Sequence, residues 1–240
     1  YRIEGQGEAA RLAAEAIEHS EAGFKMMKVK LGYGVADDIA CMAAIGRAIE
    51  GRGIRLMVDT NHAYGRADAL RLGRALADYD LLWYEEPVAP EDLRGYAEMR
   101  SKLTMPIAGG ENEHTLYGYR ELLAADALDI AQPDLGSCGG LSAARHITAL
   151  AQARGVAVNP HVWGSAIAQA ASLQLIAALP ITHHALFAQG PVLEYDRSSH
   201  PFRQQLITQP IIQQGGWVQI PHGPGLGVEV DRTVLERYRA

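Results

Sequence analysis

Residues 54–111 read IRLMVDTNHAYGRADALRLGRALADYDLLWYEEPVAPEDLRGYAEMRSKLTMPIAGGE, and this stretch decides the fold. Amphipathic segments of helical period separate three short apolar runs, which are IRLMVD at 54–59, LLWYEE at 81–86 and PIAGGE at 106–111. Each run is apolar on both faces for most of its length, as buried parallel strands are. The stretch therefore predicts a series of strand-then-helix units.

The same rhythm continues in both directions from this stretch. Further strands are expected at YRI 1–3, MMKVK 26–30, LDIAQPD 128–134, VAVNPH 156–161 and PVLEYD 191–196. Helices are expected over 8–22, 36–50, 67–79, 91–102, 115–125, 140–154 and 165–178. Eight parallel strands alternating with helices predict an α/β fold of the closed TIM-barrel type.

The end of the chain departs from this rhythm. From about residue 205 onward, short strand-like runs alternate with turn residues, and a short helix follows Thr233. We therefore expect a barrel over residues 1–204 and an irregular C-terminal tail over residues 205–240.

Composition excludes several classes of function. The chain has 240 residues, 48% hydrophobic and 21% charged, which indicates a sizeable globular protein. A net charge of -6 gives no basic surface for nucleic acid or an anionic membrane. No apolar run approaches the roughly 18 residues of a spanning helix, and two cysteines do not make a disulfide framework. We expect a soluble, cytoplasmic protein whose partner is a small molecule.

Polar side chains end nearly every predicted strand. In barrels of this type the catalytic groups lie at the carboxyl ends of the strands. The residues found there are Lys28 and Lys30, Asp59, Glu85 and Glu86, Glu111, Asp134, His161 and Glu194.

Three of these acids repeat at the spacing of one strand-helix unit. Asp59, Glu85 and Glu111 are separated by 26 residues each, so neighbouring strands would bring three carboxylates together. Converging anions repel unless a cation lies between them, and oxygen ligands favour Mg²⁺. Spacing alone does not choose between Glu85 and Glu86. Each acid taken singly is also compatible with a helix cap or a surface charge.

Lys28 and Lys30 are two residues apart, so both point to the same face of a strand. If that face is exposed to solvent, the two lysines are ordinary surface residues. Inside a barrel, two ammonium groups about 6 Å apart repel by about 3 kcal/mol, which lowers one lysine pKa by about 2 units. Such a lysine can accept a proton near neutral pH.

Asp134 and His161 are 27 residues apart, which again places them on neighbouring strands. A hydrogen bond between them would fix the imidazole tautomer and make His161 a second acid/base group, although a single histidine is often only structural. Asn61 and His62 follow Asp59 directly and are candidates for contact with a substrate.

The order of seven motifs resembles that of the enolase superfamily, in particular its mandelate racemase subgroup, over the whole chain. These motifs are KVK 28–30, VDTNHAY 58–64, WYEEP 83–87, AGGEN 108–112, QPDLGSCGG 132–140, NPHVWG 159–164 and LEYD 193–196. The resemblance implies a (β/α)7β barrel that binds Mg²⁺ and removes the proton α to a substrate carboxylate, with stabilisation of an enediolate.

The resemblance also implies a role for each candidate residue. It makes Asp59, Glu85 and Glu111 the metal ligands, and so selects Glu85 over Glu86. It makes Lys30 the base on one face and Lys28 the neighbour that lowers its pKa. It implies that Asp134 and His161 form the pair on the other face. Glu194 is similar to the group that hydrogen-bonds the enolate oxygen.

Within the subgroup, five segments look most similar to the galactarolactone cycloisomerases and related acid-sugar enzymes. These segments are GYGVADDI 32–39, EEPVAPE 85–91, NPHVWGSAIAQAA 159–171, EYDRSSHPFR 194–203 and IPHGPGLGVEVD 220–231. The implied reaction is β-elimination or cycloisomerisation of an acid sugar or its lactone, and acid-sugar dehydration and racemisation are alternatives because a scaffold does not fix the substrate.

Members of this family carry an N-terminal α+β capping domain, to which nothing in this sequence corresponds. A catalytically silent barrel fragment is therefore a further alternative. If the protein has no such domain, the apolar surface that the domain would cover is expected to favour a homo-oligomer.

Overall fold

The computed structural model describes residues 8–180 and 190–239. The chain divides into two compact units. The first comprises residues 1–109, 122–130 and 214–217, and the second comprises residues 110–121, 131–213 and 218–240.

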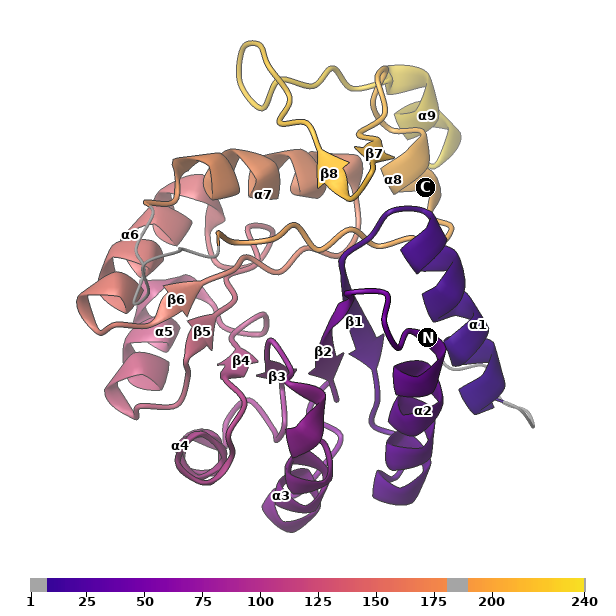
Figure 1. The fold of residues 1–240 in the computed structure, drawn as a ribbon. Helices are drawn as coiled ribbons and strands as arrows, with labels where there is room; N and C mark the ends of the chain where they lie inside the picture. The colour runs from indigo at the N-terminus through magenta and orange to yellow at the C-terminus, as the bar shows by residue number, and fades with distance from the viewer. Residues whose placement is uncertain (1–7, 181–189, 240) are drawn as a thin grey trace. The chain divides into compact units, whose positions relative to one another are not determined.

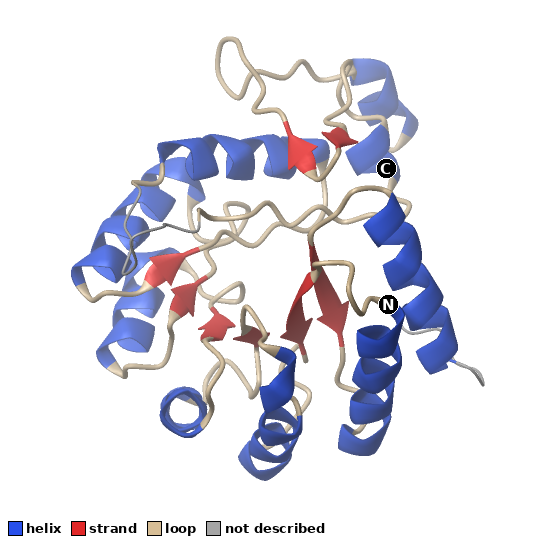
Figure 2. Ribbon diagram, in the orientation of Figure 1, coloured by secondary structure: helices blue, strands red, loops and turns tan. Residues whose placement is uncertain are grey.

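The first unit alternates helices and strands along the chain. Figure 1 labels them, and Figure 2 shows the strands in red with helices on their outer side. In order they are α1 (Glu8–Glu21), β1 (Met26–Lys30), α2 (Val35–Ala48), β2 (Arg55–Asp59), α3 (Arg66–Ala75), the 3-10 turn η1 (Ala77–Tyr79), β3 (Tyr84–Glu85), α4 (Leu93–Lys102) and β4 (Ile107–Gly109).

Parallel pairing aligns the carboxyl ends of these strands. In register, Lys30 of β1 lies opposite Asp59 of β2, and Asp59 lies opposite Glu85 of β3. Glu85 in turn lies opposite Ala108 of β4. The charged residues that end the strands are therefore neighbours along one edge of the sheet, because parallel strands present their carboxyl ends on the same side.

The second unit continues the alternation. Helix α5 and strand β5 have residues in both units, and the six strands follow one another in the sheet in the order β1 to β6. The remaining elements are α5 (Thr115–Ala124), β5 (Ile130–Ala131), α6 (Gly140–Ala153), β6 (Ala157–Val158), α7 (Ala166–Ala178), α8 (Pro201–Gln204), β7 (Gln213–Gln214), β8 (Trp217–Val218) and α9 (Arg232–Arg237).

The α/β class and all seven expected helices are confirmed, and six of the expected strands are present. The strand expected at YRI 1–3 lies outside the described residues. The strand expected at PVLEYD 191–196 was wrong, because this segment has no strand assignment and its residues are half-buried. A side chain, that of Asn159, accepts the Val192 N–H there at 2.8 Å.

The C-terminal region contains a hairpin and a short helix. Strands β7 and β8 pair with each other and are joined by Gly215 and Gly216, whose φ angles are 58° and 87°. Two consecutive positive φ values are typical of the tight turns that join hairpin strands, and glycine adopts them without a steric penalty. Asp231 caps α9 by accepting the Thr233 N–H.

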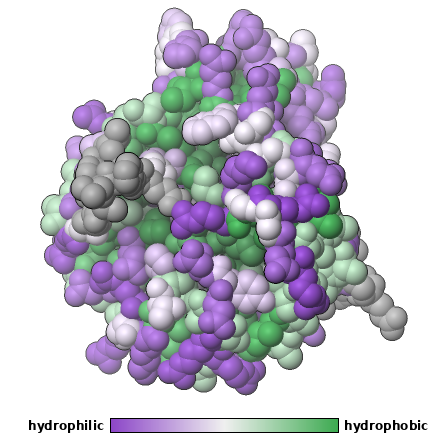
Figure 3. All heavy atoms as spheres, in the orientation of Figure 1, coloured by the Kyte–Doolittle hydropathy of each residue, from purple (hydrophilic) through white to green (hydrophobic). Residues whose placement is uncertain are grey.

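Apolar side chains form the core of each unit. Val58, Tyr84 and Ile107 are fully buried in the first, and Ala144 and Ile147 of α6 in the second. On the face shown in Figure 3, hydrophilic residues predominate over α3 and α4, as expected for the outer faces of amphipathic helices. Among the residues described, no helix has both the length and the apolarity that crossing a membrane requires.

Candidate active site

Two carboxylates lie at adjacent strand ends in the first unit. Asp59 ends β2 and Glu85 ends β3, and both side chains are 0% exposed. Their strands are paired in parallel with these two residues opposite each other. Burying two acids side by side is costly unless cations compensate them.

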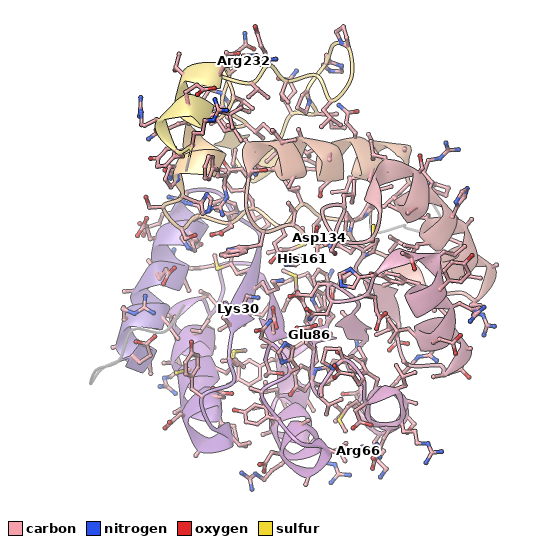
Figure 4. The ribbon with its side chains drawn as sticks, turned by 180° about the vertical axis from the view of Figure 1, so that it is seen from behind. Lys30, Arg66, Glu86, Asp134, His161 and Arg232 are labelled. Carbon is pink, nitrogen blue, oxygen red and sulfur yellow. The ribbon has the colours of Figure 1, made fainter. Side chains whose placement is uncertain are left out.

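Two lysines of β1 supply that compensation. Lys28 Nζ lies 2.7 Å from Glu85 Oε1 and 3.5 Å from Asp59 Oδ2. Lys30 Nζ donates to Asp59 Oδ2, and Figure 4 labels Lys30 in this position on β1. Both ammonium groups therefore face the interior, so the alternative of two solvent-facing lysines does not apply.

The carboxylates and lysines shift one another's pKa values. Burial raises the pKa of Asp59, and the charge of Glu85 raises it further, while Lys28 and Lys30 lower it. Burial and the charge of Lys28 lower the pKa of Lys30, but the charges of Asp59 and Glu85 raise it. The net pKa of Lys30 is above its ordinary value, opposite to the direction expected from the lysine pair alone, because the carboxylates outweigh Lys28.

Trp83 is a partner of this cluster that the sequence reasoning missed. Its indole Nε1 donates to Glu85 Oε2 at 2.9 Å, while Lys28 occupies the other oxygen of Glu85. Trp83 is two residues before Glu85, and this i, i+2 spacing on a strand was a signal that both side chains face the same way. The two contacts fix the orientation of the Glu85 carboxylate.

Glu86 makes different contacts from Glu85. It is 1% exposed, and its Oε2 accepts from Asn61 Nδ2 at 3.1 Å. The Asn61 N–H donates to Asp59 Oδ1 at 2.8 Å. Asn61, His62 and Glu86 all have positive φ angles of 45–50°, a conformation that is uncommon for residues other than glycine. Such backbone strain is typical of functional sites, and the side chains of Asn61 and His62 are exposed.

In the second unit, His161 is surrounded by carboxylates. His161 Nδ1 lies 2.7 Å from Asp134 Oδ2, and its Nε2 lies 3.4 Å from Glu111 Oε2 and 3.8 Å from Glu194 Oε2. Figure 4 shows Asp134 and His161 next to each other. The short contact with Asp134 is the expected pairing of residues that follow neighbouring strands, and it favours a proton on Nδ1.

Backbone groups hold two of these acids in place. The Gly136 N–H donates to Asp134 Oδ1 at 2.6 Å, and the Val162 N–H donates to Glu194 Oε2 at 3.3 Å. Ser137 Oγ donates to the backbone carbonyl of Glu111 at 3.3 Å.

The sequence-predicted residues are thus divided between the two units, as a first and a second group. The first unit presents two buried carboxylates, whose oxygens suit a hard divalent cation, beside two ammonium groups. The second presents an imidazole whose ring nitrogens are next to three acids, an arrangement suited to carrying a proton. The first group consists of Lys28, Lys30, Asp59, Asn61, His62 and Glu85, and the second of Glu111, Asp134, His161 and Glu194.

Known proteins resemble this chain in both sequence and structure. It is 43% identical over 227 residues to D-galactarolactone cycloisomerase of Agrobacterium fabrum, a match that covers 95% of this chain and 60% of that protein. A crystal structure of the 3,6-anhydro-D-galactonate cycloisomerase from Zobellia galactanivorans superposes with a TM-score of 0.88 at 40% identity, covering 96% of this chain and 63% of that one.

A third protein was crystallised with a metal. The L-talarate dehydratase from Polaromonas sp. JS666, in complex with Mg and L-glucarate, gives a TM-score of 0.84 at 28% identity and covers 98% of this chain and 61% of that one. The chain thus spans about three fifths of the length of the relatives it matches.

These similarities confirm the TIM-barrel-like fold class. The sequence pattern described as "Enolase C-terminal domain-like" matches residues 9–234, nearly the whole chain. The chain therefore belongs to the Enolase C-terminal domain-like family.

Proposed function

We propose that this protein is a Mg²⁺-dependent enzyme that removes the proton α to the carboxylate of an acid sugar or its lactone, leading to β-elimination or cycloisomerisation. The observation that carries this proposal is the pair of fully buried carboxylates, Asp59 and Glu85, beside the ammonium group of Lys30. Two carboxylates suited to bind a metal therefore lie next to a lysine that can act as the proton acceptor.

The metal ligands in this proposal are Asp59, Glu85 and Glu111. All three offer carboxylate oxygens, the ligands that Mg²⁺ prefers. Asp59 and Glu85 lie opposite each other in the sheet, and Glu111 follows β4, the strand that pairs with β3. Burial and the charge of Glu85 raise the pKa of Asp59 in spite of the two lysines, which supports a further cation beside it. When bound, Mg²⁺ would supply positive charge opposite the negative charge that develops on the substrate carboxylate.

Lys30 is the base on one face of the substrate. It must lose a proton before it accepts one from the α-carbon, and Lys28 favours that loss by charge repulsion. The Lys30 ammonium group is held at Asp59, so the side chain is already directed toward the cluster that binds the carboxylate.

His161 carries a proton on the opposite face in this proposal. Asp134 holds its Nδ1 and stabilises the imidazolium form, which leaves Nε2 to face the substrate. In a β-elimination, the electron pair left at the α-carbon forms the double bond, the β C–O bond breaks, and His161 gives its proton to the departing oxygen. Glu194, 3.8 Å from Nε2, would hydrogen-bond the enolate oxygen.

Asn61 and His62 are proposed to contact the substrate, because their exposed side chains follow Asp59 directly. We further propose that residues 1–204 form the catalytic barrel, that residues 205–240 form a C-terminal tail of the kind that in this family packs toward the capping domain, and that the protein is a homo-oligomer.

The substrate class rests on the relatives. The similarity to D-galactarolactone cycloisomerase supports a sugar lactone as the substrate of this protein. The similarity to L-talarate dehydratase, crystallised with L-glucarate, supports dehydration of an open-chain acid sugar as the second candidate. Racemisation would use the same two proton carriers. A silent fragment remains the contrasting alternative, since the chain spans 60% of that cycloisomerase.

Incorporation of solvent deuterium at the α-carbon tests the proposal. The protein is incubated in D₂O with Mg²⁺ and D-galactarolactone, galactarate or L-glucarate, and exchange is followed by NMR. We expect exchange with at least one compound, loss of exchange in Lys30→Ala, and full exchange in Lys102→Ala, whose lysine is exposed at the end of α4. Mg²⁺ binding without exchange would favour the silent fragment and contradict the proposed activity.

A further inference from the structure

The segment that carries Glu194 is tethered by side chains. Residues 191–196 are not assigned as a strand, yet the Val192 N–H donates to Asn159 Oδ1 at 2.8 Å. Asn159 is itself buried, and its N–H donates to the carbonyl of Ala131 in β5 at 3.0 Å. One asparagine therefore connects the start of this segment to the end of β5.

Tyr195, the next residue after Glu194, provides a second tether. Its hydroxyl donates to the Ile211 carbonyl at 3.0 Å and accepts the Gln213 N–H at 3.3 Å. A single hydroxyl thus satisfies two backbone groups of the 211–213 stretch. A phenyl ring would leave both without this partner, because it offers neither a donor nor an acceptor.

A partly buried ion pair holds the following residue, Asp196. Arg203 Nη2 lies 2.7 Å from Asp196 Oδ2, and Arg203 Nη1 donates to the Ser198 carbonyl at 2.9 Å. Glu194 therefore lies between tethers on either side, and its own carboxylate accepts the Val162 N–H. That carboxylate lies 3.8 Å from His161 Nε2.

We propose that Tyr195 is a positioning residue that holds the Glu194 carboxylate beside His161 by anchoring its segment to residues 211–213. In this proposal Tyr195 acts through Glu194 rather than on the substrate itself. The consequence for catalysis rests on the function proposed above, whereas the consequence for structure does not. In this proposal residues 211–213 of the C-terminal region help to fix the position of the Glu194 carboxylate.

Hydrogen exchange of the Val162 amide tests the structural part, because that N–H reports whether Glu194 is in place. In Tyr195→Phe we expect this amide to exchange about tenfold faster, and amides of α6 such as that of Ile147 to be unchanged. Tyr238→Phe is the matched control, since it removes a half-exposed tyrosine hydroxyl from the same unit and should leave Val162 protection intact.

A double-mutant cycle tests the catalytic part. We expect Tyr195→Phe to lower the rate of α-proton exchange about tenfold, with little change in KM or in Mg²⁺ affinity. In a Glu194→Gln background, the same substitution should change the residual rate less than twofold, because Tyr195 then has no carboxylate to position.

Three outcomes would overturn the proposal. They are an unchanged Val162 amide in Tyr195→Phe, equally faster exchange of Val162 and Ile147, and fully additive effects of Tyr195→Phe and Glu194→Gln. If the wild-type protein shows no α-proton exchange, the proposed function fails, and the amide measurement still decides whether Tyr195 positions Glu194.

Discussion

Replacing Lys28 by methionine would test how the buried acids are compensated. Methionine keeps most of the aliphatic stem of lysine and removes the ammonium group. In the structure that group lies 2.7 Å from Glu85 Oε1 and 3.5 Å from Asp59 Oδ2, and the lysine side chain is 12% exposed. The substitution therefore leaves two buried carboxylates with one cation fewer.

The expected loss of stability follows from these distances and this burial. At an effective dielectric constant of about 20, the two contacts are worth about 6 and about 5 kcal/mol of Coulomb attraction. Much of this attraction is offset by the cost of removing the charges from water, and breaking a buried ion pair costs about 3–5 kcal/mol. For a chain of this length, that loss lowers Tm by about 6–20 °C.

Thermal unfolding of both proteins, with and without Mg²⁺, is the assay. A bound cation compensates the same carboxylates, so we expect the drop in Tm to be at least halved when Mg²⁺ saturates the protein. Lys102→Met is the matched control, because Lys102 pairs with Glu98 at 2.6 Å but is 48% exposed. An exposed pair contributes about 1 kcal/mol or less, or up to about 4 °C. The reasoning would be refuted if both variants lowered Tm equally, or if the decrease in Tm of Lys28→Met were the same with and without Mg²⁺.

The other predictions concern protons and the metal. Lys30→Ala and His161→Asn should each reduce exchange of the α-proton on their own face by about 10²–10⁴-fold, as measured by NMR on the two substrate epimers; loss on both faces in either variant contradicts the assignment. Glu111→Gln should weaken Mg²⁺ binding at least about tenfold in calorimetry, and unchanged affinity removes Glu111 from the ligand set. The rise in Tm on adding Mg²⁺ should be larger near about pH 8 than near about pH 5. Because the pKa of Asp59 is raised in the folded protein, the free energy of unfolding falls as pH rises through that pKa, and a bound cation restores it. An increase in Tm on adding Mg²⁺ that does not depend on pH would argue against the site.

The sequence predicted the elements of the barrel well where the pattern is strong. Every expected helix is present, and the 26-residue spacing of Asp59 and Glu85 reflects their opposition in a parallel register. The spacing of Asp134 and His161 likewise predicted a contact, which is observed at 2.7 Å. Periodicity works here because buried strands and amphipathic helices bury apolar surface in regular ways.

Other features depend on contacts that no spacing encodes. PVLEYD reads as a strand, but the structure holds Val192 through the side chain of Asn159. Glu85 and Glu86 are both buried, and their contacts with Lys28 and Asn61, respectively, help to distinguish them. The direction of the Lys30 pKa depends on how close Asp59 comes, which two lysines in a sequence do not reveal.

The claim on which the account depends is that Asp59 and Glu85 help to hold one divalent cation. Calorimetric titration of the metal-free protein with Mg²⁺ tests this claim most directly, compared with Asp59→Asn as the ligand variant. We predict binding of one ion per chain to the wild-type protein and its loss in Asp59→Asn. Equal binding by both proteins, or no binding by the wild-type protein, would contradict the account.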